Sequence, residues 1–376
     1  MEPLLRLNSF AEHLGSLIDS AADRSFADAD ISDESFEGLA LELFRLQVAA
    51  NPCYRRLIEY SEIDPILVAS WREIPCVPTA AFKELDMTSL PEDSRPYVFR
   101  SSGTTQSNRG KHFHFDASLA LYEKSLLAWF RHHVIRGLGN DSSLCIMTPS
   151  ARSVPESSLV HMFDVVRRAG GFRSAEFYGD VSIDGGWGLP VERLVLALVE
   201  WCRAGVPVLL VGTAFNFVQL LDGLTERGER LVLPAGSRLL ETGGYKGRTR
   251  ELAKGDLYRE ICVALGVSSD QIVSEYGMSE LSSQAYDHCI GTDLDASVPR
   301  RFRFTPWSRG LVVSPETGLE VGLGETGLIQ VFDLANVWSV MAIQTEDLGV
   351  RHRDGIELLG RAELAEAKGC SLMPKL

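Results

Sequence analysis

Val208-Leu-Leu-Val-Gly212 is a short apolar run, and it is followed by a helical pattern over Ala214–Leu221 and by a second run, Arg238-Leu-Leu-Glu-Thr242. Similar strands and helices continue on both sides of this stretch. They are predicted at Leu144–Thr148, Ser157–Ala169, Val191–Ala204 and Arg248–Leu265. Strands that alternate with helices favour a parallel sheet with crossover helices. The sequence therefore predicts an α/β fold.

The two ends of the chain have different patterns. Residues 1–80 are predicted to be mainly helical, with Leu39, Leu43 and Leu46 near one face of a helix that ends before Pro52. After about residue 305, apolar runs alternate with turn residues, which predicts a small antiparallel sheet or barrel. We expect a helical region 1–96 packed on the catalytic body, a core 97–358 and a short tail 359–376.

Composition limits the function. The chain has 376 residues, 45% hydrophobic content and a net charge of −14, which argues against binding to nucleic acid because that affinity needs lysine and arginine. The seven cysteines are scattered, as in a reduced cytoplasmic protein. We see no signal peptide and no apolar run long enough to span a membrane. The expected location is the cytoplasm.

Two glycine-rich stretches are similar to nucleotide-binding motifs but do not meet their requirements. Gly322-Leu-Gly-Glu-Thr-Gly327 matches the dinucleotide pattern, but a β-rich run follows it where that pattern needs a helix, so we predict a turn between antiparallel strands. Gly103 to Lys111 has the wrong glycine spacing for a P-loop, and His112 stands in place of the Mg²⁺-binding hydroxyl. Neither a zinc-protease pattern nor a serine-hydrolase elbow is present.

Four other segments carry polar groups suited to chemistry. Ser101-Ser-Gly-Thr-Thr105 offers donors to phosphate oxygens, although a plain polar loop explains it equally well. Ser274-Glu-Tyr-Gly-Met-Ser-Glu280 ends in a carboxylate, and Mg²⁺ needs only one or two of these beside phosphate oxygens. Thr345-Glu-Asp347 places an acid at a strand end, and Gly360-Arg361 precedes Cys370.

In order and spacing, these segments resemble the adenylate-forming superfamily of acyl-CoA synthetases and adenylation domains. Within it, the chain is most similar to the acyl-protein synthetases of bacterial bioluminescence, the LuxE type. The supporting residues are Phe99–Gln106, Glu241-Thr-Gly-Gly-Tyr-Lys-Gly-Arg248 and Lys368-Gly-Cys-Ser-Leu372. The resemblance implies a large-domain fold with parallel-sheet αβ subdomains, a small β-barrel-like subdomain and a truncated C-terminal domain.

The resemblance also implies a role for each matching residue. ATP and Mg²⁺ would be the cofactors, with Lys111 neutralising charge and Glu280 holding the metal. The nucleotide would be bound by the phosphate loop, by glycines that shape a pocket and by residues at the adenine and ribose: Ser101, Ser102, Gly103, Thr104, Thr105, Gly243, Gly244, Tyr276, Gly277, Met278, Asp347 and Arg361.

The expected reaction has two steps. A carboxylic acid is activated to acyl-AMP with release of pyrophosphate, and the acyl group then passes to a thiol, for which the resemblance points to Cys370. Three departures from the superfamily stand out. Glu346 replaces the glycine of the ribose motif, Gln106 replaces a loop glycine, and the usual catalytic lysine is missing unless Lys368 or Lys375 takes its place.

Several alternatives remain open. The acyl acceptor could be CoA or the phosphopantetheine of a carrier protein, with Cys370 uninvolved, and the chain could also be a nucleotide-binding subunit without catalysis. The substrate could be a fatty or an aryl acid. The resemblance implies an acyl-accepting or reductase partner protein, and a homodimer is the commonest default state.

Overall fold

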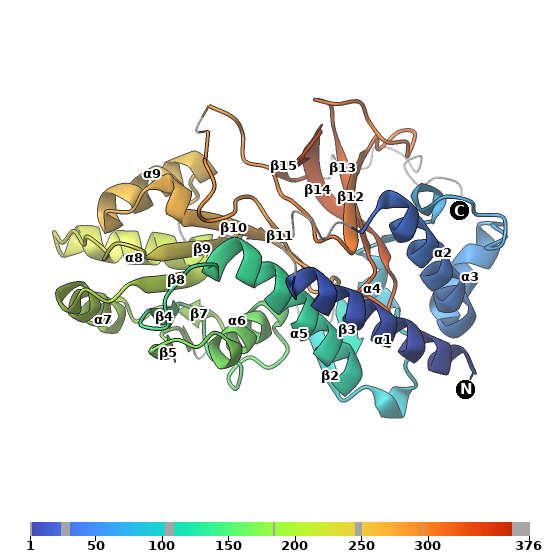
Figure 1. The fold of residues 1–376 in the computed structure, drawn as a ribbon, viewed down its shortest axis with the longest axis horizontal. Coiled ribbons are helices and arrows are strands. Elements are labelled where there is room, and N and C mark those ends of the chain that lie inside the picture. The colour runs from blue at the N-terminus through green and yellow to red at the C-terminus, as the bar shows by residue number, and fades with distance from the viewer. Residues whose placement is uncertain are drawn as a thin grey trace. The chain divides into compact units, whose positions relative to one another are not determined.

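The structure is a computed structural model and describes residues 2–23, 31–101, 109–182, 185–244, 250–295 and 297–362. It divides into two compact units (Figure 1). Unit 1 contains 1–129, 277–285 and 299–376, and unit 2 contains 130–276 and 286–298. The domain boundaries drawn from the sequence at 96 and 358 stay predictions.

Unit 2 is built on a parallel sheet. Its strands β4 (Ser143–Ile146), β5 (Ser174–Phe177), β8 (Val208–Thr213), β9 (Arg238–Thr242) and β10 (Ile272–Tyr276) lie in the order β10-β9-β8-β4-β5. Every neighbouring pair is parallel. The predicted alternation of strands and helices is therefore confirmed in this unit.

Helices cover this sheet, and their ends follow from the sequence. They are α6 (Ser158–Ala169), α7 (Val191–Ala204), α8 (Ala214–Glu226) and α9 (Lys254–Leu265). Gly205 and Gly266 end α7 and α9 in the left-handed region, at φ 65° and 64°, where a side chain would be strained. Apolar residues such as Leu198, Phe217 and Ile261 are fully or almost fully buried in one continuous core.

Unit 1 begins with helices. These are α1 (Glu2–Asp23), α2 (Asp33–Ala50), α3 (Pro52–Tyr60) and the short α4 (Ala81–Glu84), with 3₁₀ turns η1 (Trp71–Glu73) and η2 (Glu92–Ser94). The predicted helix end at Asn51-Pro52 is confirmed. The Asn51 side chain accepts hydrogen bonds from the backbone of Cys53 and Tyr54, which caps α3, and Pro52 takes its first position.

Two sheets complete unit 1. Strands β2 (Tyr97–Arg100) and β3 (Lys111–His114) form an antiparallel pair ahead of α5 (Asp116–Phe130). Strands β12 (Ser308–Val313), β13 (Thr326–Asp333), β14 (Ala342–His352) and β15 (Gly355–Arg361) form the predicted antiparallel sheet, and β1 (Val77–Pro78) adds a parallel strand beside β14. The glycine-rich stretch that ends at Gly327 leads into β13 and not into a helix, as predicted.

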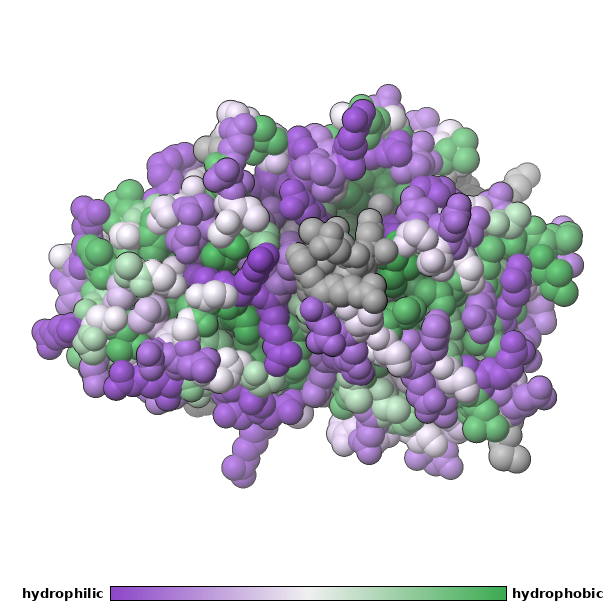
Figure 2. Space-filling view, in the orientation of Figure 1, coloured by the Kyte–Doolittle hydropathy of each residue, from purple (hydrophilic) through white to green (hydrophobic). Residues whose placement is uncertain are grey.

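Short elements fill the remaining connections. They are β6 (Asp180–Val181), β7 (Trp187–Gly188), a π-helical turn (Arg131–Ile135) and a 3₁₀ turn η5 (Ser269–Gln271). The short strand β11 (Ala285–Tyr286) pairs with β10. Among the described residues, no helix combines the length and the apolar character that crossing a bilayer requires. Polar and charged side chains cover much of the face drawn in Figure 2, with smaller apolar areas between them.

Candidate active site

The loop that starts at Ser101 closes on itself at Gly110. The backbone N–H of Ser101 donates to the Gly110 carbonyl over 3.1 Å, and the Gly110 N–H donates to Ser101 Oγ over 2.8 Å. The Arg109 Nε donates to the Ser101 carbonyl over 2.6 Å. The antiparallel pair β2–β3 thus fixes the stem of the predicted phosphate loop. The loop residues Ser102, Gly103, Thr104 and Thr105 lie outside the described residues.

Glu280 lies directly against this stem. A Cβ added to Gly110 would come within 2.6 Å of Glu280 Oε1 and 3.2 Å of Ser101 Oγ, so only glycine leaves room for the carboxylate. Glu280 itself is only 4% exposed. The carboxylate of the Tyr276–Glu280 motif and the two ends of the hydroxyl-rich loop are therefore brought together, although 170 residues separate Gly110 from Glu280 along the chain.

The surroundings of the Glu280 carboxyl disfavour its ionised form. Burial raises the pKa of this carboxyl, while the positive charges of Lys83 and Arg361 lower it and Glu346 raises it. A buried carboxylate of this kind gains most from a cation nearby. No group of three or more metal-binding side chains is found among the described residues, and Glu280 is the carboxylate that faces the loop stem. Such a site fits Mg²⁺, which takes its other ligands from phosphate and water.

Three side chains that the sequence analysis did not assign to the site hold the turn around Glu280. The ring Nδ1 of His112 lies 2.9 Å from the Ser279 carbonyl, and burial lowers the pKa of His112 to about 4. The neutral ring can therefore donate to that carbonyl. Asn336 Nδ2 donates to the Glu280 carbonyl over 2.8 Å. The third side chain is Asp333.

Asp333 is fully buried and accepts four hydrogen bonds. Its Oδ2 accepts from the backbone N–H of Ser282 and Ser283 at 2.9 and 2.8 Å. Its Oδ1 accepts from Ser283 Oγ and from the Ala335 N–H at 2.7 and 3.0 Å. The sequence carried one signal for this role, because an acid and an amide stand in the otherwise apolar run Val331-Phe-Asp-Leu-Ala-Asn336.

The other assigned residues on strands of unit 1 belong to two different sheets. Asp347 and Arg361 are register partners on β14 and β15, and the Asp347 N–H bonds to Thr345 Oγ1 over 3.1 Å. Lys111, on β3, forms an ion pair with Asp86. Asp86 also pairs with Arg95 at 2.9 Å. The charge of Lys111 is therefore partly neutralised by Asp86, and its assignment to phosphate stays a prediction.

The assigned residues of unit 2 lie at the ends of adjacent parallel strands. Gly243 and Gly244 follow β9 and are exposed, with no atom within 4 Å of an added Cβ, and Gly244 has φ +99°. Tyr276 ends β10 and is buried. The carboxyl ends of parallel strands are where such sheets bind ligands. Gly277 is exposed and Met278 is half-buried in unit 1.

Two acids at the same strand ends lie in segments that the sequence singled out, but they were given no role of their own. Glu241 is buried and accepts from Ser274 Oγ at 3.0 Å and from Tyr258 Oη at 3.2 Å. The second acid is Glu275 on β10, which is the register partner of Thr242 on β9. Burial, together with the charge of Glu241, raises the pKa of Glu275 to about 8. These acids make the edge of the sheet polar close to the predicted nucleotide residues.

The family is decided by a match over nearly the whole chain. The model of the family described as "Acyl-protein synthetase, LuxE" matches residues 16–375. The chain belongs to the acyl-protein synthetase family. The resemblance drawn from its motifs is confirmed. A curated relative, the long-chain-fatty-acid–luciferin-component ligase of Vibrio harveyi, is 21% identical over 338 residues, which is 86% of this chain and 82% of the relative.

Solved structures agree with this acyl-protein synthetase fold. An open conformation of 2-hydroxyisobutyryl-CoA ligase, in complex with 2-HIB-AMP and CoA, matches with a TM-score of 0.64 and 15% identity over 88% of this chain and 69% of that chain. The same ligase in its thioesterification state matches with a TM-score of 0.64 and 17% identity. The predicted adenylate-forming fold class is confirmed, and with the family it makes this chain an acyl-adenylate-forming ligase.

Proposed function

We propose that this acyl-protein synthetase uses ATP and Mg²⁺ to convert a fatty acid into acyl-AMP and then transfers the acyl group to the thiol of Cys370. From Cys370 the acyl group passes to a partner protein. The contact that carries the proposal is the approach of the Glu280 carboxylate to Gly110, where the loop begun at Ser101 closes. This contact supports the proposal because it sets an acid suited to Mg²⁺ beside the Ser101 hydroxyl, at the stem of the loop whose side chains would donate to phosphate.

The first step needs orientation more than covalent help from the protein. An oxygen of the fatty acid carboxylate attacks the α-phosphorus of ATP, the bond from that phosphorus to the bridging oxygen breaks, and pyrophosphate leaves. Ser101 and the loop donors would hold the phosphate oxygens as negative charge spreads over them. Mg²⁺, when bound to Glu280 and the phosphates, would neutralise part of that charge. Asp347 would bind the ribose hydroxyls and Tyr276 would flank the adenine.

The second step needs a reactive thiol, and most of the described cysteines are poor candidates. Cys145 and Cys289 are buried. Burial raises the pKa of Cys76, Cys145 and Cys202, which disfavours the thiolate that acts as nucleophile. Cys370 lies outside the described residues, and its role as nucleophile is supported by the resemblance of Lys368–Leu372 to the family. Its thiolate would attack the acyl carbonyl, and the bond to AMP would break.

The choice of acid and partner rests on the family. The relative from Vibrio harveyi is named a long-chain-fatty-acid–luciferin-component ligase. A long-chain fatty acid is the substrate that this name suggests for the present chain. A reductase as the acyl-accepting partner is what the resemblance to the family implies. The six described cysteines are all free thiols, which fits a protein that works in the reducing cytoplasm.

A panel of carboxylic acids tests the proposal. Each acid is incubated with ATP, Mg²⁺ and the wild type, Cys370→Ser or Cys53→Ser, and we follow pyrophosphate release and intact protein mass. We expect fatty acids to drive release and to add one acyl mass to the wild type and Cys53→Ser but not to Cys370→Ser. Release without any added mass would move the acceptor to CoA or a carrier protein. No release with any acid would leave a nucleotide-binding subunit.

A further inference from the structure

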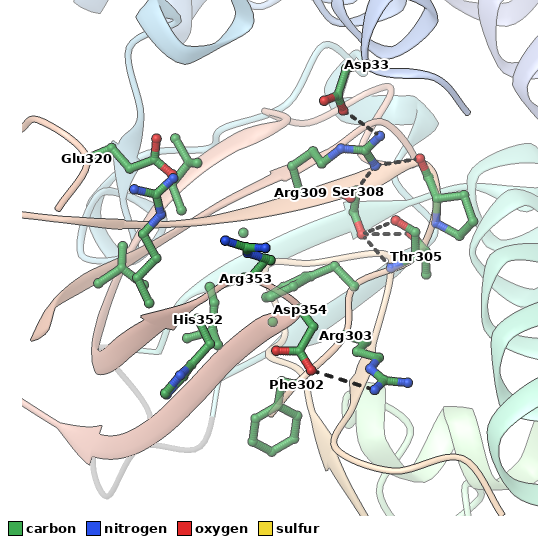
Figure 3. A pocket seen from close by; sticks show the side chains of 18 of the residues that line it. Asp33, Phe302, Arg303, Thr305, Ser308, Arg309, Glu320, His352, Arg353 and Asp354 are labelled. Carbon is green, nitrogen blue, oxygen red and sulfur yellow. Dashed lines mark hydrogen bonds and ion pairs between the residues drawn. The ribbon is translucent and has the colours of Figure 1, made fainter. Parts of the chain in front are cut away.

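A pocket lies on the antiparallel sheet of unit 1, and its lining is separate from the residues that surround Glu280. It has a volume of about 590 Å³, which is within the range of small-molecule sites. Its walls come from β12, the β14–β15 turn, the 302–306 segment, the η1 turn, the end of α5 and the start of α2 (Figure 3). Ser101, Gly110, Lys83, Arg361 and Glu280 do not line it.

The charge of this pocket is opposite to that of the whole chain. Five arginines line it, together with three acids: Arg72, Arg303, Arg309, Arg351 and Arg353 against Asp33, Glu320 and Asp354. The lining therefore has two more positive than negative charges, while the chain carries a net charge of −14. No lysine is among these cations. Arginine is the side chain that binds phosphate and carboxylate through two parallel hydrogen bonds.

The acids leave part of this positive charge uncompensated. Glu320 is shared, since it lies 2.9 Å from Arg351 and 3.9 Å from Arg72. Asp354 is shared in the same way, because it pairs with Arg301 and reaches Arg303 only at 3.9 Å. Each of these acids brings one negative charge to two guanidinium groups, so each group of three keeps a net positive charge.

Arg353 has no partner at all among the described residues. It is exposed, and the structure gives it neither a hydrogen bond nor an ion pair within the described ranges. Figure 3 shows its guanidinium group in the middle of the labelled side chains, with no dashed line to any neighbour. Arg309 differs, since it bonds to the carbonyls of Pro306 and Ile31 and pairs with Asp33 at 3.4 Å. Arg353 is therefore the cation most available to a ligand.

Aromatic rings provide the apolar part of the pocket. Trp71, Trp129, Phe302 and Phe304 line it beside the arginines. Gly310 allows the Phe304 ring to approach the sheet, because an added Cβ would be only 2.5 Å from that ring. A lining of rings and guanidinium groups suits a ligand with an anionic group on a flat or apolar body.

We propose that this pocket binds a small anion, with a phosphate or carboxylate group carried on an apolar or aromatic body, at a site separate from the adenylation site. Arg353 bonds to the anionic group, and the half-buried ring of Phe304 contacts the body. The site does not depend on the identity of the acid or of the acyl acceptor.

Calorimetric titration with two probes tests this site. 1-Naphthyl phosphate and 1-naphthoate share a ring and differ in the anion, so their relative affinities identify the preferred group. We expect the wild type to bind at least one probe and Arg353→Ala to bind it about tenfold more weakly or worse, because a charge-assisted hydrogen bond is lost. With Arg353→Glu, the titration should show no binding of that probe. The matched control is Arg56→Glu, a charge reversal at an exposed arginine of α3, which should bind as the wild type does.

Three results would overturn the proposal. They are no binding of either probe to the wild type, binding that Arg353→Glu leaves unchanged, and equal losses in Arg353→Glu and Arg56→Glu. Fatty-acid-dependent pyrophosphate release serves as a second measurement. Because the pocket shares no residue with the surroundings of Glu280, Arg353→Glu should keep this activity within about twofold of the wild type, even though the probe is lost.

Discussion

Gly110→Ala is the substitution that examines the candidate site most closely. The added Cβ would lie 2.6 Å from Glu280 Oε1, which is about 0.8 Å closer than the 3.4 Å at which ordinary contact begins. Glu280 is buried, so its carboxylate cannot retreat freely into solvent. A displacement of about 1 Å at a reacting centre can cost about 100-fold in rate. We therefore expect Gly110→Ala to lower the kcat of fatty-acid-dependent pyrophosphate release by roughly 100-fold.

The effect on stability should be much smaller than the effect on rate. Gly110 does not have a positive φ, so alanine is allowed by the backbone, and crowding of this kind costs about 1–3 kcal/mol of unfolding free energy. The control is Gly38→Ala, in α2 of the same unit, where nothing lies within 4 Å of the new Cβ. It should keep full activity and gain up to about 1 kcal/mol in stability.

A second substitution shows whether the clash with Glu280 is the cause. Glu280→Asp withdraws the carboxylate by one carbon–carbon bond, about 1.5 Å, and so makes room for the new methyl group. We expect Gly110→Ala to cost less than about threefold when it is added to Glu280→Asp, although it costs roughly 100-fold in the wild type. Equal losses in both backgrounds would refute the reasoning, and so would full activity of Gly110→Ala alone.

Two further substitutions test the buried Asp333 and the half-buried Glu275. Asp333→Asn replaces one carboxylate oxygen by an NH₂ group that faces two donors, and each unsatisfied donor costs about 1–3 kcal/mol, so urea unfolding should show a loss of about 2–6 kcal/mol. The exposed Asp64→Asn should change stability by less than about 1 kcal/mol, and similar values for both would contradict the role of Asp333. The pKa of Glu275 is raised to about 8 from an ordinary value of 4.5. Below pH 4.5 the carboxyl is neutral in both the folded and the unfolded chain, so the shift has little effect on stability. As the pH rises towards 8, the unfolded chain loses this proton more readily than the folded one, and the fold is increasingly destabilised. Glu275→Gln should therefore be more stable than the wild type at pH 8, by about 2–4 kcal/mol. Thermal unfolding should show this difference shrinking towards pH 5. A difference that does not depend on pH would contradict the raised pKa of Glu275.

The sequence predicted the regular elements of unit 2 well because local signals define them. The predicted bounds of α7 and β9 are those of the structure, since helical periodicity ends at Gly205 in the first case and a five-residue strand ends before Gly243 in the second. The start of α9 was placed too early, at Arg248 instead of Lys254. Thr249 is of a residue type that can cap a helix, whereas Ala253, the observed N-cap position of α9, makes no side-chain cap bond, so the local pattern favours the earlier start.

The candidate site could be predicted only in part. Ser101 and Glu280 were assigned from motifs with a known order, and the structure brings both of them against Gly110. The contacts of Gly110, His112 and Asn336 join segments that are far apart along the chain, and no local pattern announces them. His112 reaches Ser279 across 167 residues, and Asn336 reaches Glu280 across 56. Roles of this kind depend on tertiary packing, which periodicity and motif spacing do not describe.

Exchange of labelled pyrophosphate into ATP is the most direct test of acyl-adenylate formation at Glu280, because it needs the first step alone. We predict exchange that requires both a fatty acid and Mg²⁺, that persists in Cys370→Ser and that falls at least about 100-fold in Glu280→Gln. Exchange by Glu280→Gln at the rate of the wild type, or no exchange by the wild type with any acid, would contradict acyl-adenylate formation at Glu280.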